Sequence, residues 1–242
     1  MDGFDGRTVL VTGAAGGIGG TIVRRLVAAG ADVVASARKA ADLEALVAET
    51  GCRTAPCDLT SEEEVQAALE GLDLDGVVSC AGFGGEIATP METDMAVFDA
   101  VMAANARSVM LVTKHASRGM VARGRGGAIV NVSSQAALVA LDNHVSYAAS
   151  KAAVDSITRV SALELGRHGI RVNGVHPTVV MTEMSAFYWG RPEVGGPFLE
   201  QMPLGRWATE DDVAGPVLFL LSDAAAMVTG IALPVDGGYT CR

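Results

Sequence analysis

Short runs of β-branched and other apolar residues alternate along the chain with longer stretches rich in Ala and Leu. Runs such as VLV, GVV and AIVNV are almost continuously apolar, which is typical of parallel strands covered by helices on both faces. This alternation predicts an α/β fold, a doubly wound parallel sheet of about seven strands with helices on both faces. The expected strands cover residues 8–12, 32–37, 53–57, 76–80, 128–133, 171–175 and 231–235, and the expected helices cover residues 17–29, 40–49, 61–69, 95–120, 145–165 and 210–221.

The chain is expected to form one domain over residues 1–242, because no Pro/Ser-rich linker, shift in composition or internal repeat divides it. Residues 183–203 differ from the rest. They are rich in Met, Gly, Pro and aromatic residues, show no clear period and lie between an expected strand and an expected helix. We expect a mobile substrate lid there, and a disordered surface loop is the alternative.

Composition and charge exclude several classes of protein. With 18 Lys+Arg against 28 Asp+Glu, the net charge of −10 lacks the positive surface that nucleic acid or an anionic membrane requires. The first residues do not resemble a signal peptide, and no stretch approaches the about 18 consecutive apolar residues of a spanning helix. The four cysteines form no CxxC pair and have no His partners at zinc spacing, so no metal site or disulfide framework is predicted. We expect a soluble, cytoplasmic protein.

A glycine-rich loop, TGAAGGIG at residues 12–19, follows the first expected strand and runs into a helix. Gly13, Gly17 and Gly19 permit a tight turn, let backbone N–H groups approach a pyrophosphate and leave room for the helix to pack on the strand. Because a strand precedes the loop and a helix follows it, the motif predicts a dinucleotide-binding site.

The end of the second expected strand favours NADP(H) over NAD(H). Folds that prefer NAD place a carboxylate there for the ribose 2′-hydroxyl, whereas this chain has Ala37 followed by Arg38 and Lys39. The two cations could hold a 2′-phosphate, Arg38 through a bidentate contact, or be solvated residues at a helix start. Asp58, after the third expected strand, is placed to accept from an adenine amino group or to cap the helix that follows.

Three side chains form a candidate catalytic site. Tyr147 and Lys151 are four residues apart in a helical stretch, so their side chains share one face. A neighbouring lysine favours the ionised form of a phenol, which lets a tyrosine act as acid or base. Ser134 follows the strand expected at 128–133 and would lie at the carboxyl edge of the sheet, where its hydroxyl could donate to a carbonyl oxygen.

Together these motifs resemble the short-chain dehydrogenase/reductase family along essentially the whole chain. The matching segments are TGAAGGIG at 12–19, DL at 58–59, CAG at 80–82, Asn105, Ser134, YAASK at 147–151 and the turn at 177–182. The resemblance implies a Rossmann-type fold and hydride transfer by a tetrad of Asn105, Ser134, Tyr147 and Lys151. In this tetrad Tyr147 is the acid/base, Lys151 supports it and holds the nicotinamide ribose, Ser134 orients the substrate oxygen and Asn105 anchors a water. The implied cofactor contacts also include Ile18, Leu59, Ala81, Gly82, Pro177, Val180 and Thr182.

A narrower resemblance lies in the second half of the chain. Segments such as ARGRGGAIVNVSSQ, DNHVSYAASKAA, HPTVVMTEM and LPVDGGYTC are similar to the dicarbonyl/L-xylulose reductases. This similarity implies an NADPH-linked homotetramer that reduces α-dicarbonyls and ketoses. Apolar faces of the helices at 95–120 and 145–165 would form one interface and residues 231–242 another. The implied substrate contacts are Ser134, Gln135, Asn143, His144, Tyr147 and Trp189.

The chain departs from the family pattern at several positions, among them residues 79–80 and 176. Ser79-Cys80 replaces the usual paired asparagines, which is expected to loosen hydrogen bonding across the central strands. His176 stands where the family more often has a small or amide residue, and either packs in the interior or contacts cofactor or substrate.

One alternative function is a 3-oxoacyl-thioester reductase, although only Arg191 and Arg206 could meet an acidic carrier protein. The other is a non-catalytic nucleotide sensor with the same fold.

Overall fold

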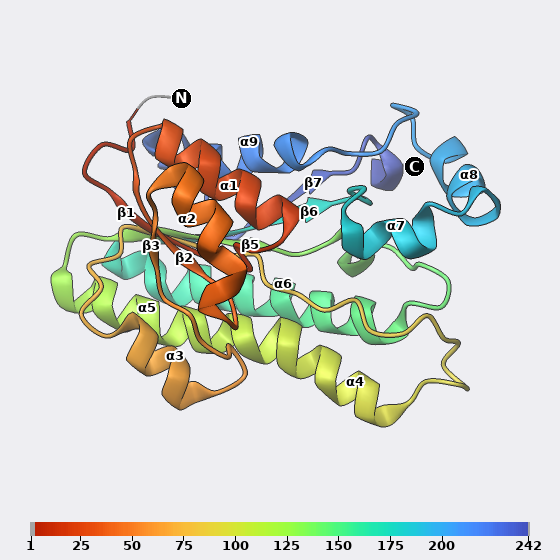
Figure 1. The fold of residues 1–242 in the computed structure, drawn as a ribbon, viewed down its shortest axis with the longest axis horizontal. Coiled ribbons are helices and arrows are strands. Elements are labelled where there is room, and N and C mark those ends of the chain that lie inside the picture. Colours follow the sequence, from red (N-terminus) through yellow and green to blue (C-terminus); the bar gives the residue numbers. More distant parts are fainter. Residues whose placement is uncertain (1–2, 242) are drawn as a thin grey trace.

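The computed structural model describes residues 3–241, apart from the side chains of Glu183 and Met184, and strands alternate with helices as the sequence predicts (Figure 1). The strands are β1 (Thr8–Thr12), β2 (Asp32–Ser36), β3 (Arg53–Thr54), β4 (Gly76–Ser79), β5 (Gly127–Val132), β6 (Ile170–Pro177) and β7 (Ala232–Val235). The helices are α1 (Gly17–Ala28), α2 (Glu44–Thr50), α3 (Glu62–Leu69), α4 (Met95–Met102), α5 (Ser108–Arg123), α6 (Val145–Leu165), α7 (Glu183–Trp189), α8 (Pro192–Glu200) and α9 (Glu210–Leu221).

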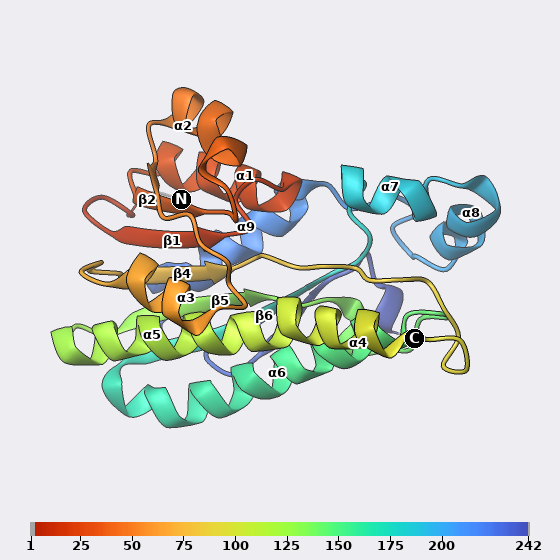
Figure 2. The same cartoon turned by 60° about the horizontal axis from the view of Figure 1, so that its bottom comes forward.

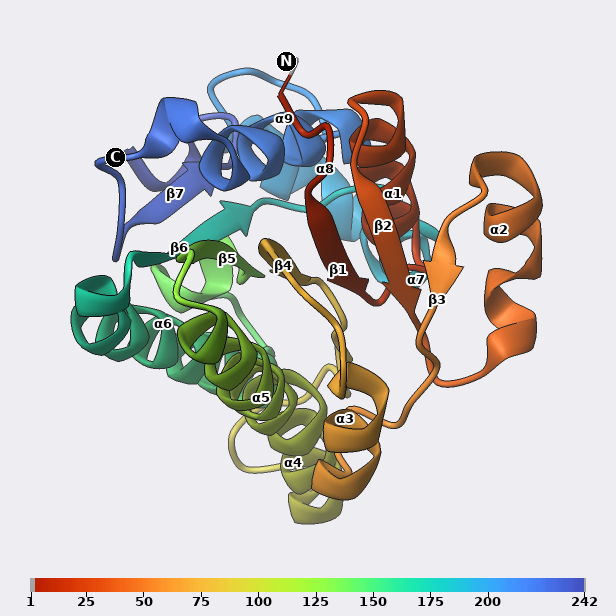
Figure 3. The ribbon, with the colours of Figure 1, turned by 90° about the vertical axis from the view of Figure 1, so that its left-hand side faces the viewer.

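The strands form one parallel sheet of seven strands in the order β3-β2-β1-β4-β5-β6-β7. Figure 3 shows α1, α2 and α9 on one face of the sheet and α3, α5 and α6 on the other. The strand order reverses between β1 and β4, where open α/β sheets bind ligands beyond the carboxyl ends of their strands. The predicted doubly wound, Rossmann-type fold is confirmed.

Two apolar cores, one on each face of the sheet, explain the continuous apolar runs in the sequence. In β1, Val9 and Val11 belong to the core under α1 and α9, whereas Leu10 belongs to the core under α3, α5 and α6. All three side chains are at most 1% exposed. Because successive side chains of a strand point to opposite faces, a strand buried on both faces needs apolar residues at consecutive positions.

The edge strand β3 is shorter than predicted. Only Arg53 and Thr54 pair regularly with β2, and both are exposed. The chain still follows the edge of the sheet beyond Thr54. The N–H group of Ala55 donates to the carbonyl of Ala35 at 2.9 Å, and that of Cys57 donates to the carbonyl of Ala37 at 3.0 Å. Pro56 lies between these two donors, so its backbone nitrogen faces away from β2 at the open edge of the sheet, where a missing N–H group breaks no hydrogen bond of the sheet.

Residues 183–203, for which the sequence pattern predicts no helix, contain the helices α7 and α8. A capping box of Thr182 and Ser185 begins α7, and Pro192 lies in the first turn of α8, where its missing N–H group costs no hydrogen bond. Aromatic packing joins the two helices, with the rings of Trp189 and Phe198 4.5 Å apart between centroids. Glycines and prolines within the segment obscure the helical period in the sequence.

One continuous helix, Met95–Arg123, runs through α4, a π-helical turn and α5. It has 29 residues and a mean hydropathy of 1.4 in its most apolar stretch, so by length and composition alone it could cross a membrane. In the sequence it does not form an unbroken apolar run, because Asp99 and Arg107 interrupt the pattern. It packs against α3 and α6, and core helices of water-soluble proteins have the same composition, so it carries no membrane assignment.

A buried carboxylate holds the turn that follows β7. Asp236 accepts hydrogen bonds from the N–H groups of Gly238 and Thr240, both at 2.9 Å, and from the Thr240 hydroxyl at 2.6 Å. Burial raises the pKa of Asp236, but these hydrogen bonds outweigh it, so the pKa lies below its usual value of 3.8. The ionised form of Asp236 therefore stabilises the folded chain.

We expect the substitution Asp236→Asn to lower the free energy of unfolding at pH 7. The lowered folded-state pKa makes this contribution fully present above about pH 3.8, and it disappears as the pH falls through the folded-state value. Urea denaturation of both proteins at pH 7 and pH 3 should therefore show a difference that shrinks at the lower pH. The exposed substitution Glu63→Gln is the control. A difference for Asp236→Asn that is equal at both pH values would contradict the assignment.

Candidate active site

The loop between β1 and α1 packs so closely against the end of β4 that two of its positions have no room for a side chain. A Cβ atom on Gly13 would lie 2.7 Å from the N and Cα atoms of Ala81, and Gly13 has a φ of +66°. A Cβ atom on Gly19 would lie 2.2 Å from the carbonyl oxygen of Gly13. The glycines of the predicted nucleotide loop are therefore required by its packing.

The N-terminus of α1 opens onto this loop without a side-chain cap. Gly16 at the N-cap supplies no acceptor, and the first turn of α1 holds no acidic residue. The N–H groups of such a turn favour an anion. A Cβ atom on Gly17 would lie 3.0 Å from Thr182 Cγ2 and 2.9 Å from Glu210 Oε1, so segments far apart in the chain meet here. Ile18 packs on the core behind the loop.

The residues predicted to bind the adenosine end lie beyond β2 and β3. Arg38 and Lys39 are both exposed. Oδ1 of Asp58 accepts from the N–H group and hydroxyl of Thr60 at 2.8 and 2.7 Å. These bonds lower the pKa of Asp58 against the effect of burial, and the charge of Arg38 lowers it further. The helix α3 is capped by Ser61 instead of Asp58, so the capping alternative for Asp58 was wrong.

The other predicted cofactor contacts lie mainly along the carboxyl edge of the sheet. They are Ala81 and Gly82 after β4, Pro177 at the end of β6, Val180 in the turn that follows, and Leu59 after β3. Val180 is 5% exposed, and its carbonyl oxygen accepts from the N–H group of Thr182 at 2.7 Å. Leu59 is partly buried against the core under α3.

Tyr147, Lys151 and Ser134 come from α6 and the end of β5. Nζ of Lys151 lies 5.6 Å from the centre of the Tyr147 ring and donates to the carbonyl oxygen of Val132 at 2.9 Å. Lys151 is only 5% exposed. The Ser134 hydroxyl accepts from the N–H group of Ala136 at 3.1 Å and, among the described residues, has no acceptor for its own hydrogen. It is therefore free to donate to a ligand.

Asn105 is fully buried in the π-helical turn between α4 and α5. Its carboxamide accepts from the N–H group of Phe83 at 2.7 Å and donates to the Phe83 carbonyl at 3.0 Å and to Ser150 Oγ at 2.9 Å. A Cβ atom on Gly82 would lie 3.5 Å from Asn105 Oδ1 and 3.7 Å from Lys151 Nζ. The side chain of Asn105 thus joins the segment after β4 to α6, beside Lys151.

The predicted substrate contacts lie next to these residues, and Gln135 differs from the others in its hydrogen bonding. Gln135 is 1% exposed, yet neither carboxamide atom has a hydrogen-bond partner within residues 3–241. Buried amide groups normally have partners, so this side chain has unused capacity for a polar ligand or a water. Asn143 is exposed with a φ of +63°, and its carbonyl accepts from Ala88 N–H at 3.0 Å.

A chain of aromatic rings connects the site to the helices over residues 183–203. The imidazole of His144 stacks on Trp189 with 5.5 Å between ring centres, and Trp189 contacts Phe198. Phe198 in turn stacks on Tyr239 at 4.7 Å, close to the C-terminus. Figure 2 shows α7 and α8 at the end of the molecule where the chain also ends. The segment expected as a lid therefore touches the predicted substrate residues through Trp189.

Sequence reasoning did not assign a role to Phe83 and Ser150, although both hold Asn105. Ser150 also donates to the carbonyl oxygen of Tyr147 at 2.7 Å. Its position one residue before Lys151 in the YAASK motif was a usable signal, whereas nothing in the sequence pattern relates Phe83 to Asn105.

At Ser79 the hydroxyl is buried without a partner among the described residues, as the loosened hydrogen bonding predicts. Burial raises the pKa of the neighbouring Cys80 thiol to about 11, although Lys151 opposes the rise, so the thiol is neutral at pH 7.

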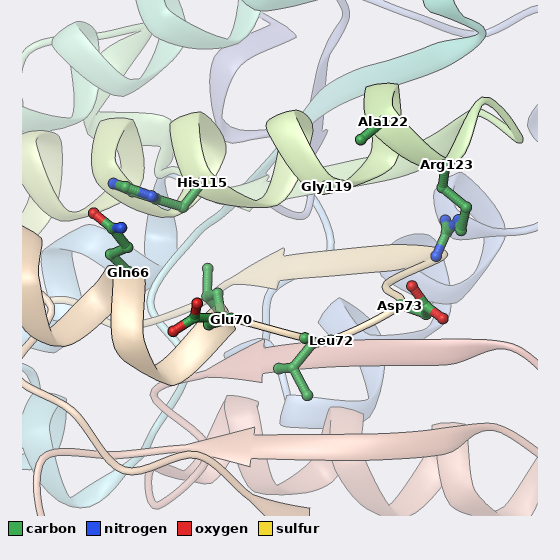
Figure 4. Close-up of a pocket in the computed structure, with 10 residues that line it drawn as sticks. Gln66, Glu70, Leu72, Asp73, His115, Gly119, Ala122 and Arg123 are labelled. Atoms are coloured by element: carbon green, nitrogen blue, oxygen red, sulfur yellow. The ribbon is translucent and has the colours of Figure 1, made fainter.

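A cavity of about 420 Å³ lies away from this site, between the end of α3 and α5 (Figure 4). Its walls include His115 and Gly119 of α5, and residues 70–73, which precede β4. It is therefore at the amino end of β4 and contains none of the predicted site residues. Within residues 3–241, no group of His, Cys, Asp and Glu side chains is placed to hold a metal ion.

Comparison with known proteins agrees with this geometry. A family model described as Enoyl-(Acyl carrier protein) reductase matches residues 13–240. The L-xylulose reductase of Bos taurus is 45% identical over 236 residues, which cover 97% of this chain and 96% of the relative. The D-erythrulose reductase of Gallus gallus is 41% identical over 98% of this chain and 96% of the relative.

Solved structures agree as well. A short-chain type dehydrogenase/reductase from Mycobacterium ulcerans has a TM-score of 0.96 and 36% identity, covering 100% of this chain and 92% of that chain. A structure from Agrobacterium tumefaciens, assigned as a 2-deoxy-D-gluconate 3-dehydrogenase with bound NADP, has a TM-score of 0.91 and 32% identity over 98% of both chains. The chain belongs to the short-chain dehydrogenase/reductase family. It is an enzyme of the oxidoreductase class, similar over nearly its full length to L-xylulose reductases.

We expect Gly19→Ala to lower the free energy of unfolding by about 1–3 kcal/mol, because the added Cβ would overlap the Gly13 carbonyl and the loop must shift. Gly16→Ala is the matched control in the same loop, since a Cβ there would meet only Gly13 O at 3.4 Å. Urea denaturation of the two variants measures the difference. Equal stabilities would show that the loop is not packed as described.

Proposed function

We propose that this enzyme transfers a hydride between NADPH and a small carbonyl compound, a ketose or an α-dicarbonyl, or the corresponding alcohol. The observation that carries the proposal is the position of Lys151, whose Nζ lies 5.6 Å from the Tyr147 ring centre and donates to the Val132 carbonyl, two residues before Ser134. The similarity of the whole chain to reductases of L-xylulose and D-erythrulose supports it. In this proposal residues 1–242 act as one dinucleotide-binding and catalytic unit, with residues 183–203 as the substrate lid.

The described residues fit a dinucleotide. The first turn of α1 has neither a side-chain cap nor an acidic residue, and the glycines before it let the loop pack closely against the segment after β4, which suits a pyrophosphate at the helix N-terminus. Arg38, and next to it Lys39, would hold the 2′-phosphate, and Asp58 the adenine amino group. The nicotinamide end would be held by Ala81, Gly82, Pro177, Val180, Thr182 and Lys151. When bound, the nicotinamide supplies or accepts the hydride.

The chain's own residues would handle the proton and the substrate oxygen. The Tyr147 hydroxyl would donate a proton to the carbonyl oxygen during reduction and take it back during oxidation. The positive charge of Lys151, close to the Tyr147 ring, would favour the phenolate that this exchange creates. The Ser134 hydroxyl would donate a hydrogen bond to the same oxygen. Asn105 would anchor a water that returns the proton from solvent.

A polar substrate suits the residues next to these groups. The carboxamide of Gln135 would satisfy its unused donor and acceptor on a hydroxyl or second carbonyl of the substrate. Asn143 and His144 would add further polar contacts, and Trp189 an aromatic wall that excludes water. A compound with adjacent oxygens, such as a ketose or an α-dicarbonyl, would engage more of these groups than a simple ketone.

We also propose a cytoplasmic homotetramer without nucleic acid or membrane partners. The support is physical: the net charge of −10 disfavours polyanions, and α5 and α6 expose apolar side chains that a further subunit would cover. Met110 is 44% exposed, Val160 51% and Leu163 82%.

Oxidation of NADPH against diacetyl, L-xylulose and an acetoacetyl thioester tests the substrate class. We expect turnover of diacetyl or L-xylulose, with a loss of about 100-fold or more in kcat for Tyr147→Phe because that variant has no hydroxyl proton to give. Turnover of the thioester alone would replace the proposal with a thioester reductase. Turnover of none of the three compounds by the wild type would favour the non-catalytic nucleotide sensor.

The cofactor preference depends on Arg38. We expect Arg38→Ala to lower kcat/KM for NADPH about tenfold or more and to leave kcat/KM for NADH within about twofold, because only NADPH carries the 2′-phosphate. Arg53→Ala, which removes an exposed arginine paired with Asp32 on the neighbouring strands, should alter neither value. Equal losses with both cofactors would remove Arg38 from phosphate recognition.

A further inference from the structure

A buried hydrogen-bond network lies directly behind the proposed catalytic residues and involves none of them through a side chain. Oδ1 of Asp155 accepts from Ser133 Oγ at 2.7 Å and from His176 Nε2, also at 2.7 Å. Ser133 is 3% exposed, Asp155 5% and His176 1%. We call this network, formed by Ser133, Asp155 and His176, the buried triad. Of the two alternatives that the sequence leaves for His176, the structure shows packing in the interior, where the imidazole is hydrogen-bonded to a carboxylate.

The buried triad joins three elements at one point. Ser133 follows β5, Asp155 lies on α6 and His176 on β6, and Figure 3 shows these elements side by side. The N–H group of Ser133 also donates to the carbonyl of Val175 at 2.8 Å, which fixes the end of β5 to β6. The side chain of Asp155 fixes the same residue to α6, and His176 on β6 binds the same oxygen of Asp155.

The hydrogen positions follow from the chemistry of the partners. A carboxylate oxygen only accepts hydrogen bonds, so Nε2 of His176 carries the hydrogen of its bond to Asp155. Nδ1 is buried and has no partner among the described residues. The imidazole is also confined by Gly174, where a Cβ atom would lie 2.8 Å from Cε1 of His176. The ring is thus held in one orientation by packing and by Asp155.

The position of Ser133 determines the position of two groups in the site. The residue before it, Val132, supplies the carbonyl that accepts from Lys151 Nζ at 2.9 Å. The residue after it, Ser134, carries the hydroxyl proposed to hold the substrate oxygen. Asp155 is one helical turn beyond Lys151 on α6, so the buried triad fixes the same two elements, β5 and α6, that carry Ser134, Tyr147 and Lys151.

We propose that Asp155 and His176 are positioning residues for the reaction: through Ser133 they hold the Val132 carbonyl and the Ser134 hydroxyl in register with Lys151 and Tyr147. The consequence for rate rests on the function proposed above, whereas the consequence for local order does not. A displacement of about 1 Å at a catalytic group can cost on the order of 100-fold in rate, so a small shift of Ser133 is expected to lower kcat.

The test compares four variants. His176→Leu removes the donor to Asp155 at similar volume, and Ser133→Ala removes the other donor with a smaller change, which keeps the test available if His176→Leu does not fold. His176→Gln restores a donor at the place of Nε2. Thr158→Val is the matched control, because it removes a buried hydrogen bond between α6 and β5, from Asn131 at 2.9 Å, one turn farther from the site.

Two readouts separate positioning from stability. We expect His176→Leu and Ser133→Ala to lower kcat about tenfold while the KM for NADPH changes less than threefold. His176→Gln should recover kcat to within about threefold of the wild type. Thr158→Val should lower the thermal midpoint of unfolding and leave kcat unchanged. Hydrogen exchange followed by mass spectrometry should show faster exchange over residues 132–136 in His176→Leu and Ser133→Ala but not in Thr158→Val.

The outcomes distinguish this inference from the proposed function. If the wild type reduces none of the substrates tested, the proposed substrate class fails, and the exchange rates of residues 132–136 still decide whether the buried triad positions this segment. His176→Leu and Ser133→Ala could instead keep the kcat and the hydrogen exchange of the wild type over these residues and, like Thr158→Val, differ only in stability. In that case the buried triad is only structural and the inference is overturned.

Discussion

Burial of the Lys151 side chain is the constraint on which the arrangement of the site depends. Removing an amino group from water is costly unless protein acceptors replace the water. Here the acceptor is the Val132 carbonyl at the end of β5, so α6 must cross β5 at a fixed register. The same register brings Tyr147, four residues earlier on α6, and Ser134, two residues beyond Val132, to the same end of the sheet. One hydrogen bond therefore aligns groups from two elements.

The opposite wall of the site depends on the absence of side chains. The segment after β4 passes between Gly13 on one side and Asn105 and Lys151 on the other, and a Cβ atom on Gly13 would overlap Ala81. Asn105 can bind this segment because the π-helical turn interrupts the helix at that residue, a distortion frequently found at functional sites. Glycine packing and the π-helical turn together bring the proposed nucleotide loop close to the proposed catalytic groups.

The sequence predicted most of the fold and the candidate catalytic residues, for different reasons. Burial of the sheet on both faces leaves continuous apolar runs, and the spacing of Tyr147 and Lys151 is local to one helix. The pairing of His176 with Asp155 could not be predicted, because 21 residues separate them and only the packing of α6 against β6 brings them together. The helices α7 and α8 were missed because their order depends on ring packing such as that of Trp189 on Phe198 instead of a helical period.

An acidic chain and an anionic cofactor are compatible because electrostatic interactions across water are short-ranged. At physiological salt, exposed charges more than about 8 Å apart are largely screened, so a net charge of −10 matters less to a small ligand than the groups that touch it. Near the proposed 2′-phosphate site the charge of Arg38 is partly offset by Asp58, and near the loop Glu210 faces Gly17. Favourable contacts are therefore confined to the uncapped end of α1 and to Arg38 and Lys39. A dinucleotide bound as proposed would reach both places, whereas an extended polyanion would meet the net negative charge of the whole chain.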